Sequence, residues 1–202
     1  RFSGLGPCVA GTAMVKERRG AELYALESFA ATRGLTGEVA ALAHASYVVE
    51  LARELLPVRE PEPEVFRLLD DVLSVLGEGP LKVGALRRFE LKLLAILGHA
   101  PVLGSCAGCG GGRLDEPGQC FDPVRGGVVC AACAPAHRGA LPLGGEARAY
   151  LLMAERGELP EAEPEVAEAA RDAVLSALTS HLSRPLKSLE FIAKVSRARR
   201  PG

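Results

Sequence analysis

The sequence predicts an α+β protein that is mostly α-helical, and three observations support this prediction. Several segments between positions 36 and 195 place apolar residues at helical spacing. The segment from 98 to 140 is instead rich in glycine, cysteine and proline. Before position 35, short apolar runs alternate with glycines, as is typical of strands and turns. We therefore expect a piece of sheet at 1–34, a helical domain formed by 35–102 and 139–202, and an irregular insertion at 103–138.

The N-terminal segment predicts two strands, at residues 12–17 and 23–26, joined by a turn at 18–20. Two strands alone do not form a domain, so they should belong to a larger sheet. Because the chain begins with Arg1 rather than Met, we expect that part of this sheet precedes the given sequence.

The helical domain should contain six helices. Thr36 is a candidate N-cap of the first, and Pro57 should end it. Gly77 and Gly98 are placed to end the second and third. An acidic, proline-containing loop should follow the fourth. The predicted ranges are 36–55, 64–76, 81–97, 145–156, 164–183 and 187–195.

The composition limits the classes of function. With 48% hydrophobic and 24% charged residues the chain is globular, and with 4% aromatic residues its core should consist of Leu, Val and Ala. A net charge of −1 provides no overall field that would attract nucleic acid or membranes. No apolar run reaches the roughly 18–20 residues that span a bilayer, and no signal-peptide pattern is visible. We therefore expect a cytosolic protein.

Two C-x2-C pairs separated by 20 residues predict a metal site in the insertion. Each pair can present two thiolates to one ion from a tight turn, and two pairs complete the tetrahedron that Zn²⁺ prefers. Four thiolates leave no position for water, so the ion should be structural. Residues 120–129 between the pairs read as strand, turn and strand, which indicates a zinc ribbon. The predicted ligands are Cys106, Cys109, Cys130 and Cys133.

Alternatives to zinc remain open: two disulfides, a redox-active C-x-x-C pair and an iron–sulfur cluster. The reducing compartment and the spacing favour zinc. Cys120 is more simply a strand residue, and Cys8 a small apolar side chain. His137, four residues after Cys133, is a less favoured competing ligand.

No enzymatic site is visible in the sequence. It contains no phosphate-binding loop, no H-E-x-x-H motif and no nucleophile–base pair. Its carboxylates are expected on exposed faces of helices and in loops. We therefore expect a protein that is not an enzyme.

The order of several short motifs resembles a known family. Residues 88–94 read RFELKLL, 98–101 read GHAP, 121–123 read FDP before Gly126 and Gly127, and 181–188 read HLSRPLKS. Together with the cysteine pairs, these motifs closely resemble the RecO family of bacterial recombination mediators, over nearly the whole chain.

The resemblance implies an N-terminal OB-fold, of which 1–34 would be the last strands, followed by a helical domain interrupted by the zinc ribbon. It also implies binding to single- and double-stranded DNA, strand annealing, and loading of the recombinase RecA together with RecR and the single-strand-binding protein. The protein would be cytoplasmic and associated with the nucleoid. Candidate DNA-binding residues in the OB-fold are Arg1, Lys16, Arg18 and Arg19.

A basic C-terminal patch could bind phosphate or an acidic partner, or it could simply be a solvated helix end. Its residues are Arg184, Lys187, Lys194, Arg197, Arg199 and Arg200. Two rival functions also remain: a zinc-ribbon adaptor that binds only protein, and a redox enzyme that uses the C-x-x-C pairs.

Overall fold

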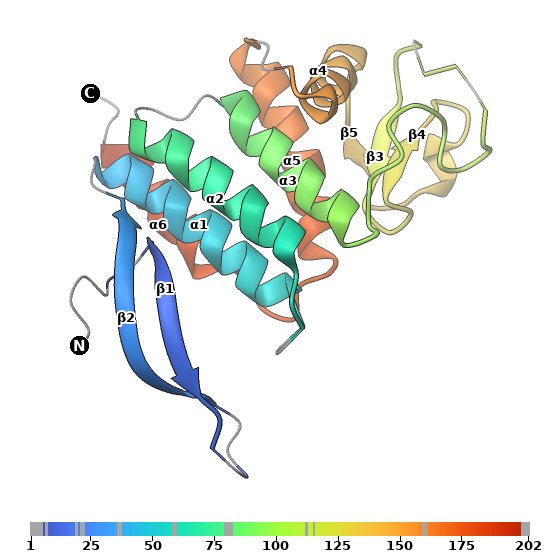
Figure 1. Cartoon of the computed structure of the whole chain (residues 1–202). Helices are drawn as coiled ribbons and strands as arrows, with labels where there is room; N and C mark the ends of the chain where they lie inside the picture. The colour runs from blue at the N-terminus through green and yellow to red at the C-terminus, as the bar shows by residue number, and fades with distance from the viewer. Residues whose placement is uncertain are drawn as a thin grey trace. The chain divides into compact units, whose positions relative to one another are not determined.

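The computed structural model describes residues 6, 8–18, 20, 23–35, 38–57, 60–78, 83–111, 113–114, 116–158 and 161–198. Packing divides the chain into two compact units. Unit 1 comprises Arg1–Arg53, Leu69–Pro80 and Leu186–Gly202, and unit 2 comprises Glu54–Leu68 and Leu81–Pro185. The structure combines helices with small sheets, and the helices account for most of the regular structure, as predicted (Figure 1).

In unit 1, strands β1 (Val9–Lys16) and β2 (Ala25–Gly34) form an antiparallel hairpin that is long and mostly exposed (Figure 1). The prediction of a second strand at 23–26 was too short. Polar residues of β2 such as Glu27 and Thr32 interrupt the apolar pattern, yet backbone pairing continues as far as Val9 opposite Gly34. An OB-fold barrel cannot be recognised from this hairpin alone, so the OB-fold stays a prediction.

Most of helix α1 (Val39–Leu55), the C-terminal half of α2 (Pro63–Glu78) and α6 (Lys187–Ala198) also belong to unit 1. The predicted N-cap Thr36 lies outside the described residues. The start of α6 is held by α1, because the Glu50 carboxylate accepts the backbone N–H groups of Ser188 at 2.8 Å and Lys187 at 3.2 Å. Glu50 thus accepts first-turn N–H groups of α6 that are normally satisfied by the N-cap residue next to the helix.

Unit 2 is built on three helices that contact one another: α3 (Val83–Ile96), α4 (Gly145–Arg156) and α5 (Pro164–Thr179). Their fully buried side chains include Leu93, Leu94, Leu151 and Leu178. Helix α5 ends at Thr179 rather than at the predicted residue 183. The N–H groups of His181 and Leu182 donate to carbonyls three residues back, and Pro185 cannot continue a helix.

The core of unit 2 encloses an ion pair. All carboxylates were expected on exposed faces of helices and in loops, so this pair was not predicted. Glu90 on α3 is fully buried and accepts a hydrogen bond of 2.8 Å from Arg87, one turn earlier. Arg87 also donates to the carbonyl of Arg171 on α5, at 3.4 Å. The pair therefore belongs to the packing between these helices.

Candidate metal centre

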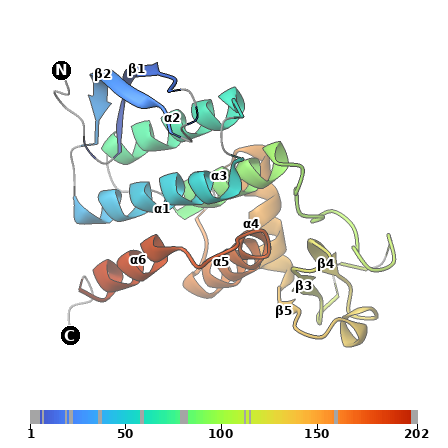
Figure 2. The ribbon, with the colours of Figure 1, turned by 90° about the horizontal axis from the view of Figure 1, so that it is seen from below.

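The ribbon of unit 2 contains three very short strands. Strands β3 (Cys120–Asp122), β4 (Gly127–Val129) and β5 (Leu141–Pro142) form a sheet in the order β4-β3-β5 (Figure 2). The hairpin predicted at 120–129 is therefore confirmed. β5 was not expected, because two residues carry no periodic signal. All residues of β3 and β4 are buried.

One glycine allows the chain before the first cysteine pair to approach this sheet. Val102 forms a parallel bridge with Gly127, and a side chain at position 127 would not fit beside Val102. A Cβ on Gly127 would lie 2.8 Å from both the Cβ and the carbonyl oxygen of Val102. The Gly126-Gly127 sequence therefore has a steric cause at its second position.

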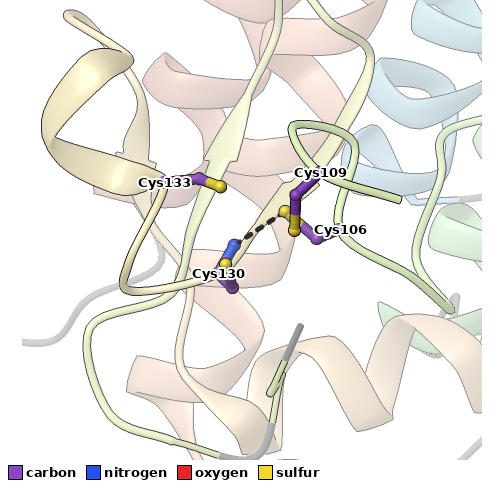
Figure 3. A group of neighbouring side chains, drawn as sticks. All are labelled: Cys106, Cys109, Cys130 and Cys133. Carbon is purple, nitrogen blue, oxygen red and sulfur yellow. Dashed lines mark hydrogen bonds between the residues drawn. The ribbon is translucent and has the colours of Figure 1, made fainter. Parts of the chain in front are cut away.

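The four predicted ligands meet in one cluster. The sulfur atoms of Cys106, Cys109, Cys130 and Cys133 all lie within 4.8 Å of one another (Figure 3). Around one Zn²⁺ at about 2.3 Å, tetrahedral thiolates would be spaced by about 3.8 Å. All six cysteines of the chain have free thiols in the structure, so neither disulfide alternative is formed. The cluster can hold a metal ion.

Backbone donors prepare the first thiol for metal binding. The N–H groups of Gly108 and Cys130 each donate to Cys106 Sγ at 3.3 Å, the second contact being drawn in Figure 3. Burial alone would raise the pKa of the Cys106 thiol, but hydrogen bonds from backbone N–H groups of Cys130, Cys109 and Gly108 lower this pKa to about 6.

The last thiol of the cluster shows the opposite effect. Hydrogen bonds with the Cys130 and Cys109 side chains raise the pKa of Cys133 to about 12. Thiolates this close repel one another, so all four can be ionised together only around a cation. The donor set therefore fits a thiophilic metal such as zinc.

The cluster has a buried side and an open side. Cys106 and Cys130 are buried, Cys133 is half-buried and Cys109 is exposed. The two knuckles contribute alike, since each supplies one buried and one more accessible cysteine.

The other candidate ligands lie outside this cluster. Cys120 is buried in β3, where burial followed by the charge of Asp122 raises the pKa of its thiol. Cys8 belongs to unit 1. His137 is not part of the cysteine group; its Nδ1 contacts the Oδ2 of Asp122. The sequence offered no signal for this contact, because Asp122 and His137 are separated by the whole β4 hairpin and the second cysteine pair.

The candidate DNA-binding residues divide into described and undescribed positions. Lys16 ends β1 and Arg18 follows it, both exposed; Arg1 and Arg19 lie outside the described residues. Lys187, Lys194 and Arg197 are exposed on α6, whereas Arg199 and Arg200 lie outside the described residues.

Arg184 differs from the rest of the basic patch because it is ion-paired. Its guanidinium donates two hydrogen bonds, of 2.7 and 2.6 Å, to the carboxylate of Glu54. Its charge is therefore partly neutralised within unit 2.

In the part of the chain that the structure describes, no helix has both the length and the hydropathy required to cross a membrane.

The fold and the cluster define a helical protein with an inserted four-cysteine ribbon, and comparison with known proteins specifies its family. Residues 37–190 match the family model described as recombination protein O C terminal. DNA repair protein RecO from Anaeromyxobacter sp. (strain K) is 38% identical over 204 residues, covering 96% of this chain and 80% of that protein. The RecO of Myxococcus xanthus (strain DK1622) is 35% identical over 158 residues, covering 78% of this chain and 64% of that protein.

The chain therefore belongs to the RecO family of DNA repair proteins. This confirms the resemblance inferred from its motifs. The RFELKLL motif lies in α3, where it supplies Phe89, Glu90 and the leucines of the helical core.

Proposed function

We propose that this chain is a DNA-binding recombination mediator that is not an enzyme. In this proposal it binds single- and double-stranded DNA, anneals complementary strands, and helps RecR and the single-strand-binding protein to load the recombinase RecA. It would act in the cytoplasm, in association with the nucleoid. The observation that carries the proposal is the 38% identity to a DNA repair protein over 96% of the chain.

In this proposal each part of the chain has a separate structural role. Residues 1–34 would complete an OB-fold, residues 35–102 and 139–202 would form the helical domain, and 103–138 would be the metal ribbon. The ribbon would hold one structural Zn²⁺ through Cys106, Cys109, Cys130 and Cys133, which all lie within 4.8 Å. When bound, the ion supplies a cross-link between the two knuckles, and four sulfur ligands leave no site for catalysis.

Exposed cations support the DNA-binding part of the proposal. Lys16 is the last residue of β1, and Arg18 lies two residues further along the chain. Both are exposed, as are most side chains of β1. Lys187, Lys194 and Arg197 add positive charge along α6. Contacts between such groups and phosphates release counterions, so binding should weaken steeply as salt increases.

The test is DNA binding by the full-length protein that contains this chain, measured by fluorescence anisotropy with a single-stranded oligonucleotide between 50 and 200 mM salt. Replacing Lys16 and Arg18 together by Ala should weaken binding and reduce the salt slope by about 1.4, because each phosphate contact on a single strand contributes about 0.7. The matched control is Lys92→Ala, which removes an exposed charge from α3.

Absence of DNA binding, or binding that salt does not affect, would contradict the proposal. If the same protein still bound the single-strand-binding protein, the result would favour the alternative of a zinc-ribbon adaptor that contacts only protein. A loss in the Lys92→Ala variant equal to that of the double variant would show that the hairpin is not the DNA contact.

A further inference from the structure

A largely buried histidine–aspartate pair lies beside the cysteine cluster. The side chains of His137 and Asp122 are only 10% and 11% exposed and contact each other through Nδ1 and Oδ2. The other Asp122 oxygen accepts the N–H groups of Val124 at 2.8 Å and Arg125 at 3.3 Å. The carboxylate is thus fixed on the β3–β4 turn, and it fixes one side of the imidazole.

The second ring nitrogen of His137 faces the first knuckle. A Cβ built on Gly108 would lie 3.4 Å from His137 Nε2 and 3.3 Å from Cys133 Sγ. Both atoms therefore border the same small space. Because residue 108 is glycine, no side chain of the knuckle separates this nitrogen from the sulfur.

This arrangement has the chemistry of a metal ligand. Histidines that bind metals commonly donate their other ring N–H to a carboxylate, which fixes the tautomer and increases the basicity of the ligating nitrogen. Neutral imidazole binds Zn²⁺ at about 2.0–2.1 Å. In His137 the Nδ1 side is engaged by Asp122, and Nε2 is the nitrogen on the side of the cluster.

We propose that His137 is a reserve ligand of the metal centre, which replaces the Cys133 thiolate when that sulfur is lost, with Asp122 as its orienting residue. The inference rests on the zinc site of the proposed function. In the intact centre four sulfurs fill the tetrahedron and His137 stays beside them. Cys133 is the sulfur replaced because it is half-buried and borders the same space as Nε2.

Oxidation is one way in which the sulfur can be lost. Hydrogen peroxide transfers one oxygen atom to the Cys133 thiolate, which becomes a sulfenic acid as the O–O bond breaks and hydroxide leaves. The oxidised sulfur is a poorer ligand than the thiolate, and His137 then completes the coordination. The ribbon would keep its ion at the accessible side of the cluster.

The test measures zinc affinity by competition with a chromophoric chelator in the full chain. His137→Ala alone should change the affinity little. Cys133→Ala should still bind one zinc, and adding His137→Ala to it should weaken binding by about tenfold or more, as expected of coupled neighbours. Asp122→Ala in the Cys133→Ala background should reproduce part of that loss.

The matched background is Cys106→Ala. Cys106 is buried and its sulfur is enclosed by two N–H donors, so His137→Ala should change zinc affinity much less there. Cobalt provides a readout of the ligand itself. Co²⁺-loaded Cys133→Ala should show d–d bands shifted to higher energy, as nitrogen replaces sulfur, and adding His137→Ala should change these bands again, because water then replaces the nitrogen.

Equal zinc affinities of Cys133→Ala with and without His137, or no zinc in Cys133→Ala, would overturn the inference. If the cysteine variants do not fold, zinc release by peroxide decides between the outcomes. It should be faster in His137→Ala than in the unchanged chain, and equal rates would overturn the inference. An unchanged chain without zinc would instead refute the metal site of the proposed function, and the inference with it.

Discussion

The helical core of unit 2 and the ribbon inserted in it stabilise buried polar groups in different ways. On α3, Glu90 is surrounded by core side chains, and its charge is balanced by Arg87 one turn away. In the ribbon, four cysteine sulfur atoms lie within 4.8 Å of one another. The helical core carries its counter-charge within one helix, whereas the ribbon gathers four thiols that could hold a metal ion.

Size explains the difference. Helices α3, α4 and α5 contact one another along whole faces and bury several leucines. The ribbon has strands of two or three residues, and segments of under about 40 residues rarely fold without metals or disulfides. Changes in the helical core should therefore affect stability without altering metal binding, and changes in the ribbon should do the reverse.

The largest effect is expected from Glu90→Ala, which leaves the buried Arg87 charge without this partner. Breaking a buried ion pair costs about 3–5 kcal/mol, so the free energy of unfolding should fall by that amount. Denaturant unfolding followed by circular dichroism measures the change, and elemental analysis should show an unchanged metal content. The control is Glu116→Ala in the ribbon, which removes an exposed ion pair with Arg113 and should cost about 1 kcal/mol or less. Equal losses in both variants would remove the distinction between the two regions.

Gly127→Ala is the reciprocal test, in the ribbon. The added methyl group would meet the backbone of Val102 at 2.8 Å, and overpacking of this kind costs about 1–3 kcal/mol. We expect weaker zinc binding with little change in helical signal. Gly104→Ala is the matched control, because no heavy atom lies within 4 Å of its Cβ position. If Gly127→Ala binds zinc as tightly as the control, the close approach of Val102 does not support the metal centre.

The smallest effect concerns a polar contact that is accessible to solvent, at Glu50 in unit 1. Burial alone would raise the pKa of Glu50, but hydrogen bonds from Ser188 and Lys187 and the charge of Arg53 lower it. A lowered pKa stabilises the folded state above the ordinary Glu value of about 4.3, and this contribution disappears as pH falls through the folded value.

Glu50→Gln should therefore destabilise the protein by about 1 kcal/mol or less at pH 7. The difference from the unchanged chain should shrink as the pH is lowered below about 4. Thermal unfolding at pH 7 and at a pH below about 4 measures this difference in stability. Glu155→Gln on α4 is the exposed control. A difference independent of pH would mean that the charge of Glu50 does not hold the start of α6.

Sequence patterns predicted the elements that have a period or a fixed spacing. The helical repeat located α1 to α6 to within a few residues, and the two C-x2-C pairs identified the cluster. Sequence patterns did not predict the features that depend on tertiary packing. Arg87 and Glu90 look like surface charges in the sequence, and only the packing of α3 against α5 encloses them.

The same limit applies to the ribbon. The two residues of β5 and the Val102–Gly127 bridge depend on pairing between distant segments, which no local pattern encodes. The contact between Asp122 and His137 also forms only when the hairpin and the second knuckle fold together.

The most direct test of the four-cysteine site is elemental analysis of the full chain purified without chelators. The account predicts one zinc per chain, loss of that zinc in Cys130→Ser, and full retention in Cys120→Ser, which removes a buried thiol outside the cluster. A chain without zinc, a chain that holds iron in its place, or a Cys130→Ser variant that keeps its ion would contradict it.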